Sequence, residues 1–145
     1  PDSLLKEFCL CVDERMSKNA HIITANEGNA IGIAAGHYLA KKSIPLVYMQ
    51  NSGLGNAINP LLTLCDPEVY SIPMMLMIGW RGEPGRKDEP QHIEQGKRQI
   101  ELLESLNLPY EIIDGTVHGI KKRIRRAVSI SKSKSMPFVL LIKKI

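Results

Sequence analysis

Residues 45–64 combine a short apolar run, a turn with two glycines and a second apolar segment, and their sequence is PLVYMQNSGLGNAINPLLTL. The run at 46–49 has the length of a strand rather than a helix, and Pro45 suits the first position of a strand. The segment 54–64 is long enough for a helix, and the turn before it offers backbone amides at the start of that helix. This order predicts a strand, a turn and a helix, the first part of a βαβ unit.

The same alternation continues on both sides of this unit. Short apolar runs predict four further strands, at residues 21–25, 74–78, 110–113 and 138–142. Helical spacing of apolar residues predicts four further helices, at residues 2–16, 28–40, 91–106 and 117–131. Strands that are apolar throughout belong in a parallel sheet covered on both faces. The sequence therefore predicts an α/β fold, a doubly wound open parallel sheet with helices on both faces, formed as one domain by residues 1–145.

The composition is that of an ordinary globular domain, with 145 residues of which 43% are hydrophobic and 23% charged. No stretch approaches the ~18 consecutive apolar residues of a membrane span, and charged residues interrupt the start where a signal peptide would be apolar. The three cysteines form no CxxC pair, so a disulfide framework is not expected. A reducing cytoplasm is the expected location.

Charge is distributed unevenly along the chain. All fifteen acidic residues lie at or before Asp114, and nine of the nineteen basic residues follow it. A basic segment of this kind is compatible with nucleic-acid binding, but no aromatic residues interleave with its charges as base stacking would require. We prefer to interpret it as a solvated helix face, so neither a nucleic acid nor a membrane is an expected partner.

In a parallel sheet of this type, ligands bind beyond the carboxyl ends of the strands. The unusual residues of this sequence fall in the corresponding places, which are Asp2-Ser3, Asn26-Glu27-Gly28, residues 50–56 and residues 79–92. Glu27 would begin a helix, where the macrodipole favours a carboxylate by ~0.3–1 kcal/mol, and a helix-capping acid is the alternative interpretation. Gly28, Gly32 and Gly36 leave one side of that helix without side chains, so the sheet, a partner helix or a ligand is expected to pack closely there.

The turn Ser52-Gly53-Leu54-Gly55-Asn56 is neither a GxGxxG fingerprint nor a phosphate loop with GK[ST]. It resembles the Ser-Gly-Pro-Gly turn of the thiamine diphosphate enzymes, with leucine in place of proline. Residues 26–30 resemble the strand–Glu–helix passage of their pyrimidine-binding domain. Residues 1–6, 50–56 and 81–92 resemble the branch of that family that decarboxylates phosphonopyruvate or sulfopyruvate. The resemblance covers essentially the whole chain and implies a pyrimidine-binding domain with flavodoxin-like layering.

The resemblance implies a role for each candidate residue. Glu27 would hydrogen-bond the aminopyrimidine of thiamine diphosphate and His92 would relay a proton to the product, although His92 also suits the first turn of a helix. Asp2 resembles a catalytic acid in the first loop of related decarboxylases and is equally well interpreted as an N-cap. The implied cofactor-binding residues are Glu27, Asn51, Gly53, Leu54, Gly55 and Asn56. Ser3 and Arg81, the latter in a loop expected to be flexible, are the candidates for binding the anionic head of a 2-oxo acid.

The family binds Mg²⁺ and the diphosphate through a second domain with a GDG motif, and residues 1–145 contain no such motif. We therefore expect no metal ligand in this chain and a diphosphate-binding domain or β subunit supplied from elsewhere, with Mg²⁺ bound there. The chain opens after the point where the family's first strand would end, which suggests an excerpt of a larger protein. A homo-oligomer is expected, because family cofactors lie between two subunits.

The expected reaction is the conversion of 3-phosphonopyruvate to phosphonoacetaldehyde and CO2. Decarboxylation of sulfopyruvate, by a chain equivalent to an α subunit, is the alternative. A non-catalytic α/β binding module is a further possibility, for which loss of Glu27 would have been a sign, but Glu27 is present.

Overall fold

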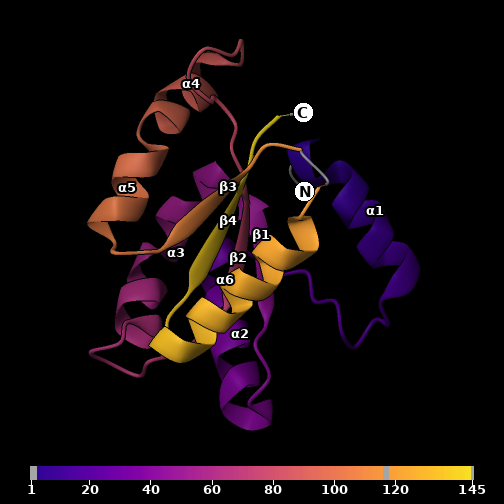
Figure 1. Cartoon of the computed structure of the whole chain (residues 1–145), viewed down its shortest axis with the longest axis vertical. Coiled ribbons are helices and arrows are strands. Elements are labelled where there is room, and N and C mark those ends of the chain that lie inside the picture. Colours follow the sequence, from indigo (N-terminus) through magenta and orange to yellow (C-terminus); the bar gives the residue numbers. More distant parts are fainter. Residues whose placement is uncertain (1–2, 116–117, 145) are drawn as a thin grey trace.

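The computed structural model describes residues 3–115 and 118–144, and its centre is a four-stranded parallel sheet (Figure 1). The strands are β1 (Leu46–Gln50), β2 (Met75–Gly79), β3 (Tyr110–Ile113) and β4 (Phe138–Ile142), in the order β1-β2-β4-β3. Ile78 of β2 lies beside Met49 of β1 on one side and Leu141 of β4 on the other. Four of the predicted strands are confirmed, each within one residue of its predicted position.

Three helices cover one face of this sheet, namely α2 (Glu27–Lys41), α3 (Leu54–Pro60) and α5 (Gln99–Ser105). One fully buried residue from each helix, Ile31, Leu54 and Leu103, belongs to the core that forms here. Alternate strand residues such as Ile78 and Leu141 complete it, as expected when successive side chains point to opposite faces. Burial of each such side chain contributes about 1.5–3 kcal/mol.

The helix α6 (Ile120–Lys134) covers the other face and lies across the front of the sheet in Figure 1. Its Ala127 is buried in a second core that includes Phe138 and Leu140 of β4. The basic residues that were expected on the outside of this helix include Lys121, Lys122, Arg125 and Arg126, and all four are exposed. Helices on both faces of an open parallel sheet confirm the predicted doubly wound α/β fold.

The strand predicted at residues 21–25 is wrong, because this segment forms neither strand nor helix. Its apolar side chains are not covered, and Ile23 is 87% exposed. Strand preference reflects packing on a half-buried surface, and no such surface is present around Ile23. His21 does reach the sheet, where its Nε2 lies 2.5 Å from the Tyr48 hydroxyl and its Nδ1 lies 3.3 Å from Asp13.

The first helix, α1 (Lys6–Arg15), follows a 3-10 turn at Ser3–Leu5 and stands beside the sheet in Figure 1. None of its residues is buried. Phe8 attaches it to β1 by packing edge-on against Tyr48, with ring centroids 5.2 Å apart. The predicted start at Asp2 lies outside the described residues, as does Val117, the predicted start of the last helix.

The helix predicted at residues 91–106 is divided at Arg98 into α4 (Pro90–Lys97) and α5. Gly96 near the end of α4 lies so close to the Gly82 carbonyl that a Cβ atom at position 96 would collide with it. In addition, the indole Nε1 of Trp80 donates to the Gly96 carbonyl at 2.9 Å. These contacts fix α4 against the loop that follows β2, over the carboxyl ends of the strands. The helix predicted at 54–64 is likewise divided, into α3 and a wide helical turn at Leu61–Cys65.

Among the described residues, no helix has both the length and the apolar character needed to cross a lipid bilayer. The cysteines Cys9, Cys11 and Cys65 are all free. Burial raises the pKa of the Cys65 thiol to about 12, so this side chain is a neutral, unreactive thiol at pH 7.

Candidate functional site

Glu27 is the first residue of α2, at the carboxyl edge of the sheet. The residue before it, Asn26, caps this helix, because its side-chain Oδ1 accepts a hydrogen bond from the Asn29 amide at 3.0 Å. The carboxylate of Glu27 is therefore not needed as the cap. It is half-buried and free to make contacts across the site.

The Glu27 carboxylate lies against the turn that follows β1. Asn56 Nδ2 donates to Glu27 Oε2 at 2.9 Å. A Cβ atom at Gly53 would lie 2.5 Å from Glu27 Cδ, so only glycine leaves room for the carboxylate in its present position. A Cβ atom at Gly28 would similarly lie 2.8 Å from the Asn56 carbonyl oxygen. Two glycines thus allow the start of α2 to pack closely against this turn.

The other two glycines of α2 have no such neighbour. Around an added Cβ atom at Gly32 or Gly36 there is nothing within 4 Å in the described part of the chain. The domain's own sheet therefore does not fill this side of the helix. Of the three neighbours expected there, namely the sheet, a partner helix or a ligand, the sheet is wrong. Ile33 and Leu39 are exposed on the same helix.

The turn residues predicted to bind cofactor have different surroundings. Leu54 belongs to the core, so only its backbone faces the site, whereas Gly55 and Asn56 are exposed. Asn51 is 4% exposed, and its amide bridges to the loop after β2. Its Nδ2 donates to the Arg81 carbonyl at 2.9 Å, and its Oδ1 accepts from the Arg81 amide at 3.2 Å. Asn51 is thus used to join two loops.

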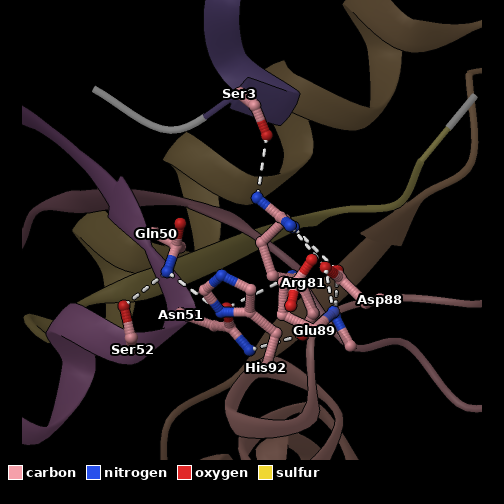
Figure 2. A network of polar contacts seen from close by, with 9 residues as sticks. Ser3, Gln50, Asn51, Ser52, Arg81, Asp88, Glu89 and His92 are labelled. Carbon is pink, nitrogen blue, oxygen red and sulfur yellow. Dashed lines mark hydrogen bonds and ion pairs between the residues drawn. The ribbon is translucent and has the colours of Figure 1, made fainter.

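Arg81 and Asp88 form the densest group of polar contacts (Figure 2). The guanidinium binds the carboxylate with two hydrogen bonds, of which Nε to Oδ2 measures 2.7 Å, and it also donates through Nη1 to Ser3 Oγ at 3.0 Å. The backbone amides of Gly82 and Glu89 donate to the same carboxylate, each at 2.9 Å. These hydrogen bonds, with that from Arg81 as the largest effect, hold the pKa of Asp88 well below its usual range. The loop expected to be flexible is therefore folded around an ion pair.

His92 lies in the first turn of α4, beside the end of β1. Its Nδ1 lies 3.5 Å from the side-chain Nε2 of Gln50, which also donates to Ser52 Oγ at 2.6 Å. Figure 2 shows the His92 ring between Gln50 and Arg81. The turn after β1 therefore contacts Glu27 through Gly53 and Asn56, and it is joined to His92 through Gln50.

The loop after β2 also contains a buried charge. Glu83 is 7% exposed, and its Oε1 pairs with Lys143 Nζ at 2.5 Å just beyond β4. Its Oε2 is buried and accepts no hydrogen bond from the described residues. Among those residues, no three His, Cys, Asp or Glu side chains lie close enough together to bind a metal ion.

The structure thus brings nine of the ten predicted site residues to one edge of the sheet, whereas Asp2 lies outside the described residues. The sequence places Gln50 and Asp88 inside the two predicted site ranges, residues 50–56 and 79–92, but it assigned neither residue a role. Asp88 follows Arg81 by seven positions in a loop with three turn-forming residues, Gly82, Pro84 and Gly85, a spacing that allows a loop to close on itself. Gln50 is a polar residue at the end of an apolar strand, which is the position from which a side chain enters such a site.

Comparison with known proteins gives a family for most of the chain. Residues 2–102 match the family described as "Thiamine pyrophosphate enzyme, N-terminal TPP binding domain". The matched range contains Glu27, the turn after β1 and His92.

Individual relatives are decarboxylases. Phosphonopyruvate decarboxylase of Streptomyces viridochromogenes is 32% identical over 122 residues, which are 84% of this chain and 30% of that protein. Sulfopyruvate decarboxylase subunit alpha of Methanococcus maripaludis is 35% identical over 122 residues, which are 84% of this chain and 70% of the relative. The subunit of the same name from Methanocaldococcus jannaschii is 34% identical over 143 residues, or 97% of this chain and 80% of the relative. The chain therefore spans about 30% of the length of the phosphonopyruvate decarboxylases that it matches.

The Asp88→Asn variant tests the ion pair in the loop. It should lower the free energy of unfolding by about 1–3 kcal/mol at neutral pH, because hydrogen bonds to a charged group are lost. Since the pKa of Asp88 is lower in the folded than in the unfolded chain, its contribution is complete above the unfolded value of about 3.9 and is lost as pH falls toward the folded value. Urea unfolding between about pH 3 and pH 7 measures this dependence.

The difference between wild type and Asp88→Asn should accordingly narrow below about pH 4. Glu89→Gln is a matched control, because Glu89 is an exposed neighbour in the same loop. A difference that stays constant as the solution is acidified would contradict the assigned role of the Asp88 carboxylate.

Proposed function

The chain belongs to the thiamine pyrophosphate enzymes, as their N-terminal TPP-binding domain, and from this we propose that it contributes Glu27 and His92 to a decarboxylase of 2-oxo acids. The observation that carries the proposal is the position of the Glu27 carboxylate. One of its oxygens is bound by Asn56, and the other lies over Gly53 without a hydrogen bond from the described residues. A carboxylate in this state is suited to share a proton with a ring nitrogen.

The residues around Glu27 fit the aminopyrimidine of thiamine diphosphate. The absence of a side chain at Gly53 makes room for the Glu27 carboxylate itself, and Gly55 and Asn56 on the same turn are exposed. Asn56 would fix Glu27 Oε2, so that Oε1 is left for the cofactor. The backbone of the turn, including that of Asn51 and Leu54, would complete the cradle. Mg²⁺ and the diphosphate would be bound by a second domain or subunit.

When bound, thiamine diphosphate supplies the electron sink that decarboxylation of a 2-oxo acid requires. Glu27 would hold or release a proton at Oε1. The conversion of a 2-oxo acid to an aldehyde and CO2 also takes up one proton at the carbon that loses CO2. His92 would deliver this proton, because imidazole exchanges protons readily near neutral pH. Gln50 and the start of α4 hold the His92 ring at the edge of the site.

For the substrate we propose 3-phosphonopyruvate, which would yield phosphonoacetaldehyde and CO2. Support comes from the names of two relatives and from the cations near the site. Arg81 is already paired with Asp88, so an anionic substrate head would share this guanidinium with a carboxylate. Ser3 Oγ, which lies 3.0 Å from Arg81 Nη1, would be a second contact for the head. The exposed Arg86 and Lys87 would add attraction at longer range.

Sulfopyruvate is the second candidate substrate. It is favoured by the relatives named sulfopyruvate decarboxylase subunit alpha, which match this chain over 70% and 80% of their own length. Both substrates carry a tetrahedral anionic head on a 2-oxo acid, so the same residues would bind either one. Assays of both substrates with the assembled enzyme discriminate between them.

Glu27→Gln tests the assignment of the cofactor site. In the assembled enzyme, this change should lower the rate of proton exchange at C2 of bound thiamine diphosphate by about 100- to 1,000-fold, equivalent to about 2.7–4 kcal/mol. An amide keeps the shape of the side chain but cannot take up the proton. NMR measurement of C2 deuterium exchange, with circular dichroism to confirm the fold, gives the result.

Glu101→Gln provides a control on an exposed face of α5 and should exchange at the wild-type rate. Exchange at the wild-type rate in Glu27→Gln would refute the role of Glu27. It would do so for either substrate, since the exchange needs no substrate.

We further propose a homo-oligomer in which the open side of α2 lies at or beside the contact. Gly32 and Gly36 allow close approach of another surface, and Ile33 and Leu39 are exposed on the same helix. Close approach gains dispersion contacts that the isolated chain lacks. Two-fold packing is the commonest way for one patch to cover itself.

Gly32→Leu should therefore weaken association at least about tenfold without loss of helix content, since the added side chain meets open space within the chain. Light scattering and circular dichroism of the variant measure both properties. Ser129→Leu, an exposed position on α6, is the matched control for an added leucine. Unfolding of Gly32→Leu, or a wild type that stays monomeric at high concentration, would contradict the proposal.

A further inference from the structure

Glu83, in the loop after β2, has a buried carboxylate with one partner. The side chain is 7% exposed, and the Lys143 ammonium, 2.5 Å from Oε1, is the group of the described residues that binds it. The second oxygen, Oε2, is buried and accepts no hydrogen bond in that part of the chain. The Lys143 side chain is 32% exposed, so solvent reaches the cation far better than the anion. The charge of Glu83 therefore depends on Lys143, because a buried charge without a counterion is strongly destabilising.

The backbone of Lys143 fixes this cation to the sheet. Its amide donates to the Ile113 carbonyl at 2.9 Å, which continues the pairing of β4 with β3 by one residue. On the other side of β4, the Trp80 amide donates to the Ile142 carbonyl at 2.8 Å, so β2 and β4 also stay joined at this level. The ion pair thus connects Glu83, a loop residue, to a residue that the sheet holds in place.

Gly82, directly before Glu83, supports the helix that contains His92. A Cβ atom at Gly82 would lie 1.7 Å from the His92 carbonyl oxygen, so the loop and the first turn of α4 meet backbone to backbone. Further along α4, a Cβ atom at Gly96 would lie 2.0 Å from the Gly82 carbonyl oxygen. With two such contacts, a displacement of Gly82 must displace α4, and the His92 ring moves with the helix.

We infer that Glu83 and Lys143 are positioning residues, which hold the loop after β2 against the end of β4 and thereby set the place of His92. The inference rests on the proposed function in one respect, namely that His92 delivers a proton during turnover. Without the cation, the loop would move outward until water reached the Glu83 carboxylate. A displacement of about 1 Å is enough to lower a reaction rate about 100-fold.

Tryptophan fluorescence tests the movement on the chain without cofactor. Trp80 is the sole tryptophan, it is 7% exposed, and its indole donates to the Gly96 carbonyl of α4. Lys143→Met should shift the emission to longer wavelength and lower the urea midpoint by at least about 1 M. Adding Glu83→Gln should reverse both effects, because no charge is then left buried. Lys144→Met, at the exposed neighbour, should change neither.

Kinetics of the assembled enzyme test the consequence for the reaction. Lys143→Met should lower kcat at least about tenfold with KM changed less than about twofold. The double variant Glu83→Gln/Lys143→Met should return kcat to within about threefold of wild type, since a neutral pair can replace a buried ion pair at little cost. The rate of C2 exchange should stay near wild type in both, because Leu54 anchors the turn beside Glu27 in the core. Lys144→Met should keep wild-type kcat.

Wild-type kcat in a folded Lys143→Met enzyme would overturn the inference. A loss of kcat or a rise in KM that Glu83→Gln does not reverse would also overturn it, since Lys143 would then act on the substrate itself. If Lys143→Met does not fold, Glu83→Asp replaces it. Its shorter side chain should draw the loop out of place and lower kcat with C2 exchange unchanged, and wild-type kcat in Glu83→Asp would equally contradict the inference.

Failure of the proposed function is recognised separately. A wild-type assembled enzyme that decarboxylates neither substrate refutes the reaction. The fluorescence and unfolding of the chain would still decide whether the Glu83–Lys143 pair holds the loop and α4 in place.

Discussion

The close approach of the Gly53 backbone to the Glu27 carboxylate is the constraint on which the site depends. Glu27 is the first residue of α2, and Gly53 lies in the turn after β1. The larger hydrophobic core holds both segments in place. Leu54, next to Gly53, has no exposed surface and anchors the turn in the larger core. Buried apolar packing thus fixes the position of the Glu27 carboxylate, so this part of the site is as rigid as the core.

The second half of the site is arranged by polar contacts. The Asn51 side chain donates to the Arg81 carbonyl and accepts from the Arg81 amide. The Arg81 side chain in turn binds Asp88, which closes the loop, and His92 after this loop lies beside Gln50. Because Arg81 is paired with Asp88, its positive charge is already partly neutralised before any substrate anion binds. A substrate head would gain less from Arg81 than from an unpaired arginine, which fits a role of the loop in holding its own shape.

Much of the fold could be predicted from the sequence because it depends on local patterns. The four confirmed strands are short apolar runs bounded by turn residues. The helices α2, α3, α5 and α6 each bury an apolar face against the sheet. The strand predicted at 21–25 failed because β-branched residues favour a strand only where neighbours cover them, and Ile22 and Ile23 are uncovered. The break at Arg98 was not predicted; it lies two residues after Gly96, whose close contact with Gly82 no local pattern reveals.

The candidate site divides in the same way. Glu27 and the glycine turn were recognisable because each lies at the start of a helix in a characteristic order of residue types. Gln50 and Asp88 gain their meaning only from partners distant in sequence or across a closed loop, so their roles required the structure.

The most direct test of this account is the rate of C2 proton exchange of thiamine diphosphate in the assembled Gly53→Ala enzyme. The added methyl group meets the flexible end of Glu27, so it should displace the carboxylate while the fold and the unfolding free energy stay near wild type. Exchange should then slow by at least about tenfold, whereas Gly55→Ala, where nothing lies within 4 Å in the described chain, should exchange normally. Wild-type exchange in a folded Gly53→Ala enzyme would contradict the claim that this close approach positions Glu27 for its function.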